Sequence, residues 1–299
     1  MLKPHLGTYH TALPVIGSWA PYDYLLGDAN PQLAPATCLY FDGISPQCDL
    51  AKTLDLAQEW FGRFGSRPKV VLVRGDKQFL SNRYSMRTLR ESVVDPHVMR
   101  AIETVEIYPK GRTTVDDAWR PSIYFTRSIS ASESGFFCIN AVLGEQSVSQ
   151  MLLEGYGVFK SCAAYGFLFP AWFSPLGYKT GISVEPSCRA LGKWRERESR
   201  RLSHWRDNSM IGIRQGCERR LHRARDGYVR DAYPLMLLDA CHLARKVGDG
   251  TLADLMPSLG HVSAVDGKVL WRIHNDNLAL AQQLLDAADI TLSGRRIEI

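Results

Sequence analysis

The sequence lacks the features of a membrane-spanning or disulfide-stabilised chain. No apolar run reaches the roughly 18 residues that a bilayer-spanning helix needs. Its seven cysteines are odd in number and include no CxxC pair, so neither a disulfide framework nor a zinc ribbon is indicated. The first residues, MLKPHLGTYHTALPVIGSW, contain no continuous apolar stretch, which argues against a secretory signal. We therefore expect a cytoplasmic protein with no membrane partner.

Short motifs of common enzyme classes are also missing. The chain contains no GxSxG nucleophile elbow, no HExxH zinc motif, no GxGxxG dinucleotide fingerprint and no GxxxxGK[ST] phosphate loop. We therefore expect no catalytic residue, no bound cofactor and no metal. An enzyme whose residues are spread over the chain remains an alternative that a single sequence does not exclude.

Two pairs of neighbouring residues contain side chains of the kinds that catalytic sites use. Cys241 precedes His242, but adjacent residues on a helix project about 100° apart, so we do not expect them to face each other as nucleophile and base. Asp76 and Lys77 follow a predicted strand, as nuclease carboxylates often do. No well-placed second acid lies nearby, so a turn or capping role for Asp76 is the favoured interpretation.

Charge is divided unevenly along the chain. The formal net charge is +5, and residues 189–230 carry thirteen Lys or Arg against five Asp or Glu, or +8, which leaves −3 for the rest. This Arg-rich segment is interpreted as a solvated helix with ion pairs in preference to a phosphate-binding surface. Residues 1–60 hold six acids against two lysines, or −4. Such asymmetry bears on partners and encounter rates.

Hydrophobic periodicity predicts a mixture of helices and strands. Residues 49–65 fit an amphipathic helix, residues 70–73 and 103–108 fit strands, and residues 122–130 and 135–144 fit a hairpin. Residues 146–165 look helical, and the aromatic segment 166–183 fits an irregular part of the core. Thr251 and Asn275 are expected to cap two C-terminal helices on either side of a strand at residues 269–273.

This order shows no regular alternation of strand and helix, so the predicted class is α+β, with mixed, mainly antiparallel sheets flanked by helices. We divide the chain into an aromatic-rich α+β region at residues 1–188 and a second region at residues 189–299. The second region combines the basic segment with a C-terminal α+β unit. Two subdomains of similar size and one continuous body are both compatible with this division.

The C-terminal runs RDAYPLMLLDACHLARKV, GTLADLMPSLG and VLWRIHNDNLALAQQLLDAADI resemble the end of bacterial immunity proteins. These are cytoplasmic antitoxins of polymorphic-toxin and type VI secretion systems, in particular those paired with toxins of restriction-endonuclease fold. The amino-terminal GSWAPYDYLL fits the same resemblance. The matching C-terminal positions are Tyr233, Pro234, Leu238, His242, Leu243, Leu252, Trp271 and Leu285.

The resemblance implies no catalysis, no cofactor and a tight complex with one cognate toxin. A nuclease toxin exposes a cationic cleft, which an antitoxin can fill with carboxylates around aromatic anchors. We therefore predict that the acidic first sixty residues face the toxin, through Trp19, Tyr22, Asp23, Asp28, Asp42 and Asp49. A structural role in loops is an equally good interpretation of these residues. The alternative function is a nucleic-acid-binding protein or nuclease that uses residues 189–230.

Overall fold

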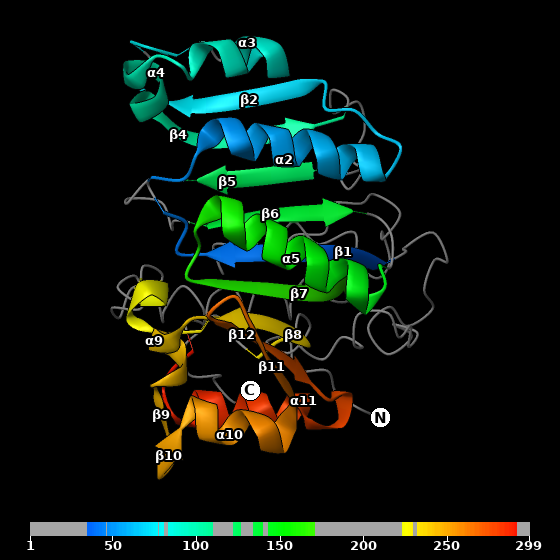
Figure 1. Cartoon of the computed structure of the whole chain (residues 1–299), viewed down its shortest axis with the longest axis vertical. Coiled ribbons are helices and arrows are strands. Elements are labelled where there is room, and N and C mark those ends of the chain that lie inside the picture. The colour runs from blue at the N-terminus through cyan, green and yellow to red at the C-terminus, as the bar shows by residue number, and fades with distance from the viewer. Residues whose placement is uncertain are drawn as a thin grey trace, which may run out of the picture.

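The computed structural model describes residues 35–45, 47–76, 78–80, 83–109, 122–126, 134–139, 143–170, 223–229 and 232–291. Within these ranges strands and helices are mixed along the chain (Figure 1). In chain order they are β1 (Pro35–Asp42), α2 (Leu50–Arg63), β2 (Val70–Gly75), β3 (Arg83–Tyr84), α3 (Met86–Ser92), α4 (Pro96–Ala101), β4 (Ile102–Tyr108), β5 (Ser122–Thr126), β6 (Ser134–Ile139), α5 (Glu145–Phe159), β7 (Ala163–Pro170), the 3-10 helix η5 (Arg223–Asp226), β8 (Leu235–Leu238), α9 (Ala240–Leu243), β9 (Lys246–Val247), β10 (Gly250–Thr251), α10 (Leu252–Leu259), β11 (Gly260–Val265), β12 (Lys268–Ile273) and α11 (Asn275–Ala287).

One ten-stranded sheet organises the described residues. Its strand order is β11-β12-β8-β7-β1-β6-β5-β4-β2-β3, and every neighbouring pair is antiparallel. Helices flank this sheet, so the predicted α+β class is confirmed. Strands β7 and β8 pair from Ala163 opposite Leu238 to Gly166 opposite Leu235. The sheet therefore includes strands from both sides of residue 188.

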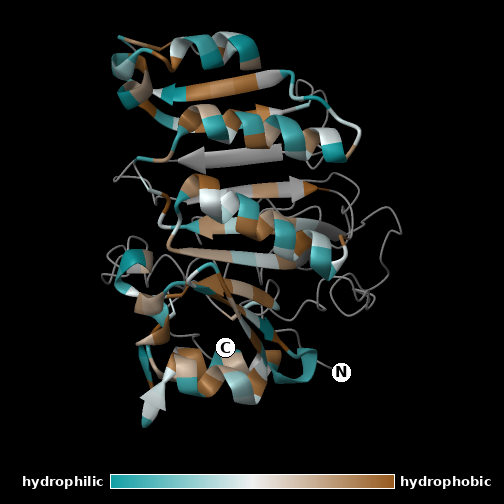
Figure 2. Cartoon of the chain, viewed as in Figure 1, coloured by the Kyte–Doolittle hydropathy of each residue, from teal (hydrophilic) through white to brown (hydrophobic). Residues whose placement is uncertain are grey.

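Helices α2 and α5 cover one face of the sheet (Figure 1). Hydrophobic and hydrophilic residues are interspersed along both helices (Figure 2), as expected for helices with one buried side. The Phe41 ring of β1 lies 6.3 Å from Trp60 of α2 and 4.9 Å from Phe159 of α5, measured between ring centroids. Gly155 of α5 faces this cluster, because a Cβ built there would lie 2.4 Å from Phe41 Cζ. The close packing of α5 on β1 therefore depends on a residue without a side chain.

Strand β12 carries contacts to helices on both faces of the sheet. The indole nitrogen of Trp271 donates to the Met256 carbonyl of α10 over 3.1 Å. The neighbouring Arg272 pairs with Glu145 of α5, and Lys268 lies 4.9 Å from the centre of the Tyr156 ring in the same helix. Successive side chains of a strand point to opposite faces. Helices α5 and α10 therefore lie on opposite faces of β12.

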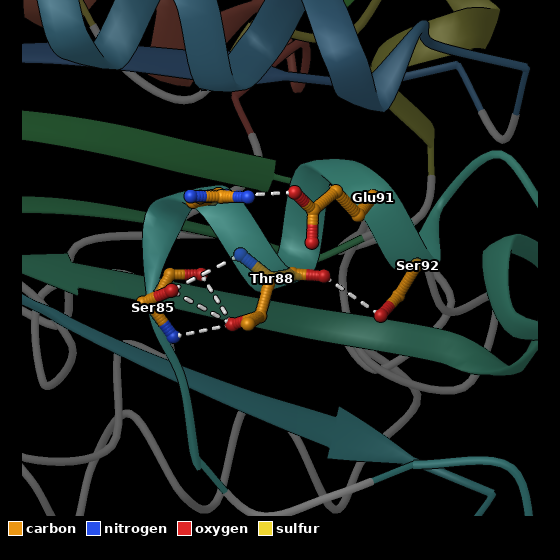
Figure 3. Close-up of polar contacts among 5 residues, drawn as sticks. Ser85, Thr88, Glu91 and Ser92 are labelled. Atoms are coloured by element: carbon orange, nitrogen blue, oxygen red, sulfur yellow. Dashed lines mark hydrogen bonds and ion pairs between the residues drawn. The ribbon is translucent and has the colours of Figure 1, made fainter.

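Local capping defines the short helix α3. Ser85 Oγ accepts a hydrogen bond from the Thr88 backbone nitrogen over 3.0 Å, and Thr88 Oγ1 accepts one from the Ser85 nitrogen over 2.8 Å (Figure 3). This capping box satisfies two backbone donors at the start of the helix. Arg87 and Glu91 form an ion pair one turn apart on the same helix. Polar contacts within α3 therefore serve the helix itself.

Most predicted elements are present in the structure. Helix α2 buries the apolar residues Leu50, Leu54, Ala57, Trp60 and Phe61 that make residues 49–65 amphipathic. Strands β5 and β6 pair, and Thr251 caps α10. The helix predicted at residues 146–165 ends earlier in the structure, so its predicted C-terminal boundary is wrong. Lys160 adopts a left-handed conformation with φ of 51° and ends α5, and residues 163–170 form β7. Strand β11 was not among the predicted elements.

No helix within the described ranges is both long enough and apolar enough to cross a bilayer.

Candidate functional site

The residues predicted to face a toxin are only partly within the described chain. Trp19, Tyr22, Asp23 and Asp28 lie outside it. Asp42 is the last residue of β1 and is 2% exposed, so its carboxylate is not offered to a partner at the surface. The structure therefore leaves Asp49 as the accessible member of this set within the described ranges.

Asp49 begins helix α2. Its Oδ1 accepts a hydrogen bond from the Lys52 backbone nitrogen over 3.2 Å, and its side chain is half exposed. A carboxylate at this position satisfies a backbone donor and interacts favourably with the helix dipole. Further along α2, Asp55 pairs with Arg90 and Glu59 pairs with Arg63. The acids of α2 thus have structural partners, which a count of charges does not show.

The Arg-rich segment is described only at residues 223–229. There Arg225 Nη2 donates to the Ile44 carbonyl over 2.8 Å, next to the end of β1. This arginine therefore links two distant parts of the chain. The other arginines of the predicted basic segment, apart from Arg223, lie outside the described residues.

The Cys241–His242 pair is closer than the sequence argument allowed. Cys241 Sγ lies 3.4 Å from His242 Nδ1, so the expectation that these side chains cannot meet is wrong. Both residues lie in the four-residue helix α9. Sγ and Nδ1 are close to the backbone in their side chains, so these two atoms meet although adjacent residues do not share a helix face. Burial raises the pKa of the Cys241 thiol, with the nearby Asp239 acting in the same direction. Burial lowers the pKa of His242 to about 4.

These pKa shifts keep the pair in its uncharged form at neutral pH. A nucleophilic cysteine needs a thiolate, which a neighbouring cation stabilises by lowering the thiol pKa. Here the thiol pKa is raised and the imidazole is neutral, so the short contact is a weak thiol–imidazole hydrogen bond. The arrangement is that of a partly buried structural contact between an exposed thiol and a buried imidazole.

A second polar group joins α5 to the end of β8. Lys268 Nζ bonds to Asp239, and Tyr156 donates its hydroxyl to the Cys162 carbonyl over 3.3 Å. Burial, followed by hydrogen bonding to Asp239, raises the pKa of Tyr156 well above its usual range. Burial also raises the pKa of Cys162 to about 11. The phenol and the thiol are therefore protonated at neutral pH. The Lys268–Asp239 ion pair joins the start of β12 to the end of β8, and Lys268 also lies over the Tyr156 ring of α5.

Asp76 of the predicted strand end forms a turn. Its Oδ1 accepts a hydrogen bond from the Gln78 backbone nitrogen over 3.0 Å, which confirms the turn interpretation. Lys77 lies outside the described residues. Within the described part of the chain, no group of three or more His, Cys, Asp or Glu side chains has an arrangement that could hold a metal ion.

Exposed apolar side chains occur near α4. Phe79 is 46% exposed and stacks on His97 of α4, with the ring centroids 6.1 Å apart. Val94 and Met99, which flank His97 in the sequence, are also exposed. Exposed apolar residues are common on protein surfaces, but aromatic and methionine side chains are enriched at protein interfaces.

The C-terminal unit, residues 232–291, is acidic. It contains seven aspartates against four lysines or arginines, a balance of −3. Two of its four cations are held in ion pairs, Lys268 with Asp239 and Arg272 with Glu145 of α5. Five of its aspartates are exposed, and the fifth, Asp289, lies in the turn after α11. We refer to the four that precede it, at turns or helix starts, as the C-terminal acids: Asp249, Asp254, Asp266 and Asp276.

The acidic balance of residues 232–291 was not predicted from the sequence. The count over the whole chain placed the excess of acid in residues 1–60, and the adjacent Arg-rich segment obscured the acidic balance that follows it. A count restricted to residues 232–291 would have found it. The exposure of the acids and the pairing of the cations required the structure.

Comparisons with known proteins give a limited result. No family model matches the sequence, and no curated protein matches it. Among solved structures, a T6SS protein of Pseudomonas aeruginosa is similar to this chain, with a TM-score of 0.44 and 16% sequence identity. The similarity covers 87% of this chain and 77% of that one.

Proposed function

We propose that this protein is an immunity protein of a type VI secretion or related toxin system. It binds a cognate nuclease-type toxin in the cytoplasm and neutralises it by steric and electrostatic occlusion, with no catalytic step of its own. The resemblance of the C-terminal runs to such antitoxins supports this proposal. The resembling residues are structural, because Tyr233, Leu238, Leu252, Trp271 and Leu285 are all buried.

The observation that carries the proposal is the exposure of the C-terminal acids in a unit whose cations Lys268 and Arg272 are held in ion pairs. A nuclease must present a cationic cleft to receive a polyanion. Exposed carboxylates complement such a cleft, and long-range attraction accelerates the encounter of two oppositely charged surfaces. A rapid encounter matters for an antitoxin, because a delivered toxin must be captured before it cleaves its substrate.

The direct test begins with the open reading frames beside this gene, where the proposal expects one that encodes a secreted toxin, and co-expresses that product with this chain. We expect cells that express both proteins to survive, and the two chains to co-purify. A toxin that kills in the presence of this chain, together with the absence of co-purification, contradicts the proposal. So does a purified chain that degrades DNA or RNA by itself.

A charge-neutralising variant tests the electrostatic part. The triple substitution Asp249→Asn, Asp266→Asn and Asp276→Asn should slow association with the toxin by about tenfold at low ionic strength, with a smaller effect in high salt. Glu91→Gln is the matched control, because Glu91 is exposed on α3 and pairs with Arg87. Equal association rates for the triple variant and the wild type would remove the C-terminal acids from the mechanism.

A further inference from the structure

Strand β11 is the last strand at one end of the sheet. It pairs with β12 over six residues, from Gly260 opposite Ile273 to Val265 opposite Lys268. Among the described residues, no strand pairs with its other side. A strand in this position presents backbone donors and acceptors in a row, which can pair with another extended segment.

The turn between β11 and β12 identifies which backbone groups point outward. Asp266 and Gly267 both have positive φ, 48° and 77°, which is the type I′ turn of a two-residue hairpin. The pair that closes such a turn, Val265 and Lys268, is hydrogen-bonded, and hydrogen-bonded and non-hydrogen-bonded pairs then alternate. The N–H and C=O groups of Val262 and Ala264 therefore point away from β12.

The sequence of β11 carries none of the usual protection of an edge strand. Natural edges are commonly blunted by lysine, by proline, by a bulge or by a very short strand. The β11 sequence GHVSAV has no charged residue and no proline, and its register with β12 is continuous. At the other end of the sheet, β3 has only two residues, which is one of the protective devices. The two ends of the sheet thus differ, and only β11 offers an extended pairing surface within the described residues.

Charge at both ends of β11 indicates the chemistry of its partner. Asp266 is exposed directly after the strand. The beginning of α11 lies beside the beginning of β11, because the His274 backbone nitrogen donates a hydrogen bond to the Leu259 carbonyl over 3.1 Å. The exposed Asp276, in the first turn of α11, is therefore near the start of β11. The cations of the adjacent β12 are held by Asp239 and Glu145. An occupant with basic residues at its ends would complement this edge.

A second copy of the chain would be a poor occupant. In an antiparallel pair of two β11 strands, the start of one strand lies beside the end of the other. Asp276 of each copy would then lie near Asp266 of the other, and like charges in such positions oppose pairing. The charge pattern therefore favours a different protein.

We infer that β11 is a docking strand for an extended basic segment of the partner protein, which adds to the sheet by backbone hydrogen bonding. This inference rests on the proposed function, since it takes the toxin as the source of that segment. It adds the mode of recognition: backbone groups of Val262 and Ala264 would supply the pairing, and Asp266 and Asp276 would select basic ends.

The experiment uses the full chain and a defined probe, a fluorescein-labelled peptide of alternating threonine and valine with a lysine at each end. Fluorescence anisotropy should show saturable binding to the wild type. Ala264→Pro removes an outward N–H while sparing the β11–β12 ladder, so affinity should fall by about tenfold or more. Ala264→Ser is the matched control and should bind as the wild type does.

A second variant does not depend on tolerance of proline. The double substitution Asp266→Asn and Asp276→Asn should weaken binding of the lysine-ended peptide. The same double substitution should have a smaller effect on a peptide that carries a glutamine at each end. Hydrogen exchange should show protection of the Val262 and Ala264 amides when the lysine-ended peptide is bound. Circular dichroism and thermal unfolding verify that each variant is folded.

Three results would overturn the inference. They are the absence of saturable peptide binding, binding that folded Ala264→Pro leaves unchanged, and a wild-type dimer that Ala264→Pro converts to monomer, which would assign the edge to a second copy. Toxin co-expression is independent of the peptide. Rescue by the wild type without peptide binding therefore contradicts the docking strand alone, and peptide binding without rescue contradicts the proposed function.

Discussion

The indole nitrogen of Trp60 in α2 donates a hydrogen bond to Oε2 of Glu154 in α5 over 3.0 Å. The other carboxylate oxygen, Oε1, accepts hydrogen bonds from Arg63 over 2.8 Å and from Gln150 over 2.9 Å. Burial disfavours the ionised form of Glu154, but the hydrogen bonds from Arg63, Trp60 and Gln150 outweigh it and lower its pKa. One carboxylate therefore joins the two helices that cover the sheet.

The substitution Glu154→Gln should destabilise the protein at neutral pH by about 1–2 kcal/mol, the contribution of charge-assisted hydrogen bonds that are partly buried. Because the folded-state pKa is lowered, this stabilisation is present above the unfolded-state pKa near 4.5 and is lost as the pH falls through the folded-state value. Urea unfolding at pH 7 and pH 3 measures the difference. Glu59→Gln is the control, because Glu59 is exposed and pairs with Arg63 but does not join α2 to α5. An equal effect of Glu154→Gln at both pH values would contradict the prediction.

His242 should make the protein less stable in mild acid. Burial lowers its pKa from 6.5 to about 4, so the unfolded chain binds a proton at a higher pH than the folded chain does. Its contribution is present above pH 6.5 and is lost as the pH falls toward 4, on the order of 3 kcal/mol in total. His242→Gln should flatten the unfolding free energy over this range, and His261→Gln, at an exposed position of β11, should not. A wild-type unfolding free energy that is constant between pH 7 and pH 4.5 would rule this out.

Two glycines of α5 should respond in opposite directions to alanine. A Cβ at Gly155 would lie 2.4 Å from Phe41 Cζ and 2.9 Å from Trp60 Cη2, whereas a Cβ at Gly157 meets nothing within 4 Å. Gly155→Ala should destabilise by about 1–3 kcal/mol through overpacking. Gly157→Ala should stabilise by about 0.5–1 kcal/mol through helix propensity. Thermal unfolding of the two variants decides the matter, and a shift of the same sign in both would show that α5 does not pack as described.

The nucleic-acid alternative has a separate test. If residues 189–230 bound phosphates, affinity for DNA or RNA would fall steeply as salt rises. We expect no electrophoretic mobility shift at moderate salt, because the proposed function needs no nucleic-acid contact. A shift that disappears between low and high salt, and that is lost when Arg219 and Arg220 are changed to serine, would favour the alternative.

Amphipathic helices were predictable because their apolar spacing is long and regular. Leu50, Leu54, Ala57, Trp60 and Phe61 identify α2 from the sequence, and the structure buries all five. Boundaries that depend on a single backbone conformation were not predictable. Nothing in the spacing of residues 146–165 indicates that Lys160 turns left-handed and ends α5 before the apolar residues do.

Strand β11 escaped prediction for a related reason. An edge strand with small residues such as Ser263 and Ala264 has no strong alternation of buried and exposed side chains to detect. Its place in the sheet comes from pairing with β12, which is a tertiary property.

The candidate site was the least predictable part. Counting charges locates an acidic region but does not distinguish a buried carboxylate such as Asp42 from a helix cap such as Asp49 or a surface acid such as Asp266. The contact between Cys241 and His242 likewise depends on the side-chain conformations of two adjacent residues, which the sequence does not specify.

The ladder between β7 and β8 has a consequence for expressing pieces of this chain. A fragment that stops after residue 188 would keep the pairing of β7 with β1 but would leave Ala163–Gly166 unpaired on the side that β8 occupies. It would also uncover Tyr165, whose ring packs 4.8 Å from that of Tyr233. In such a truncated product, the central strand β7 would become an edge strand with an exposed aromatic side chain, and the fragment would be prone to aggregate.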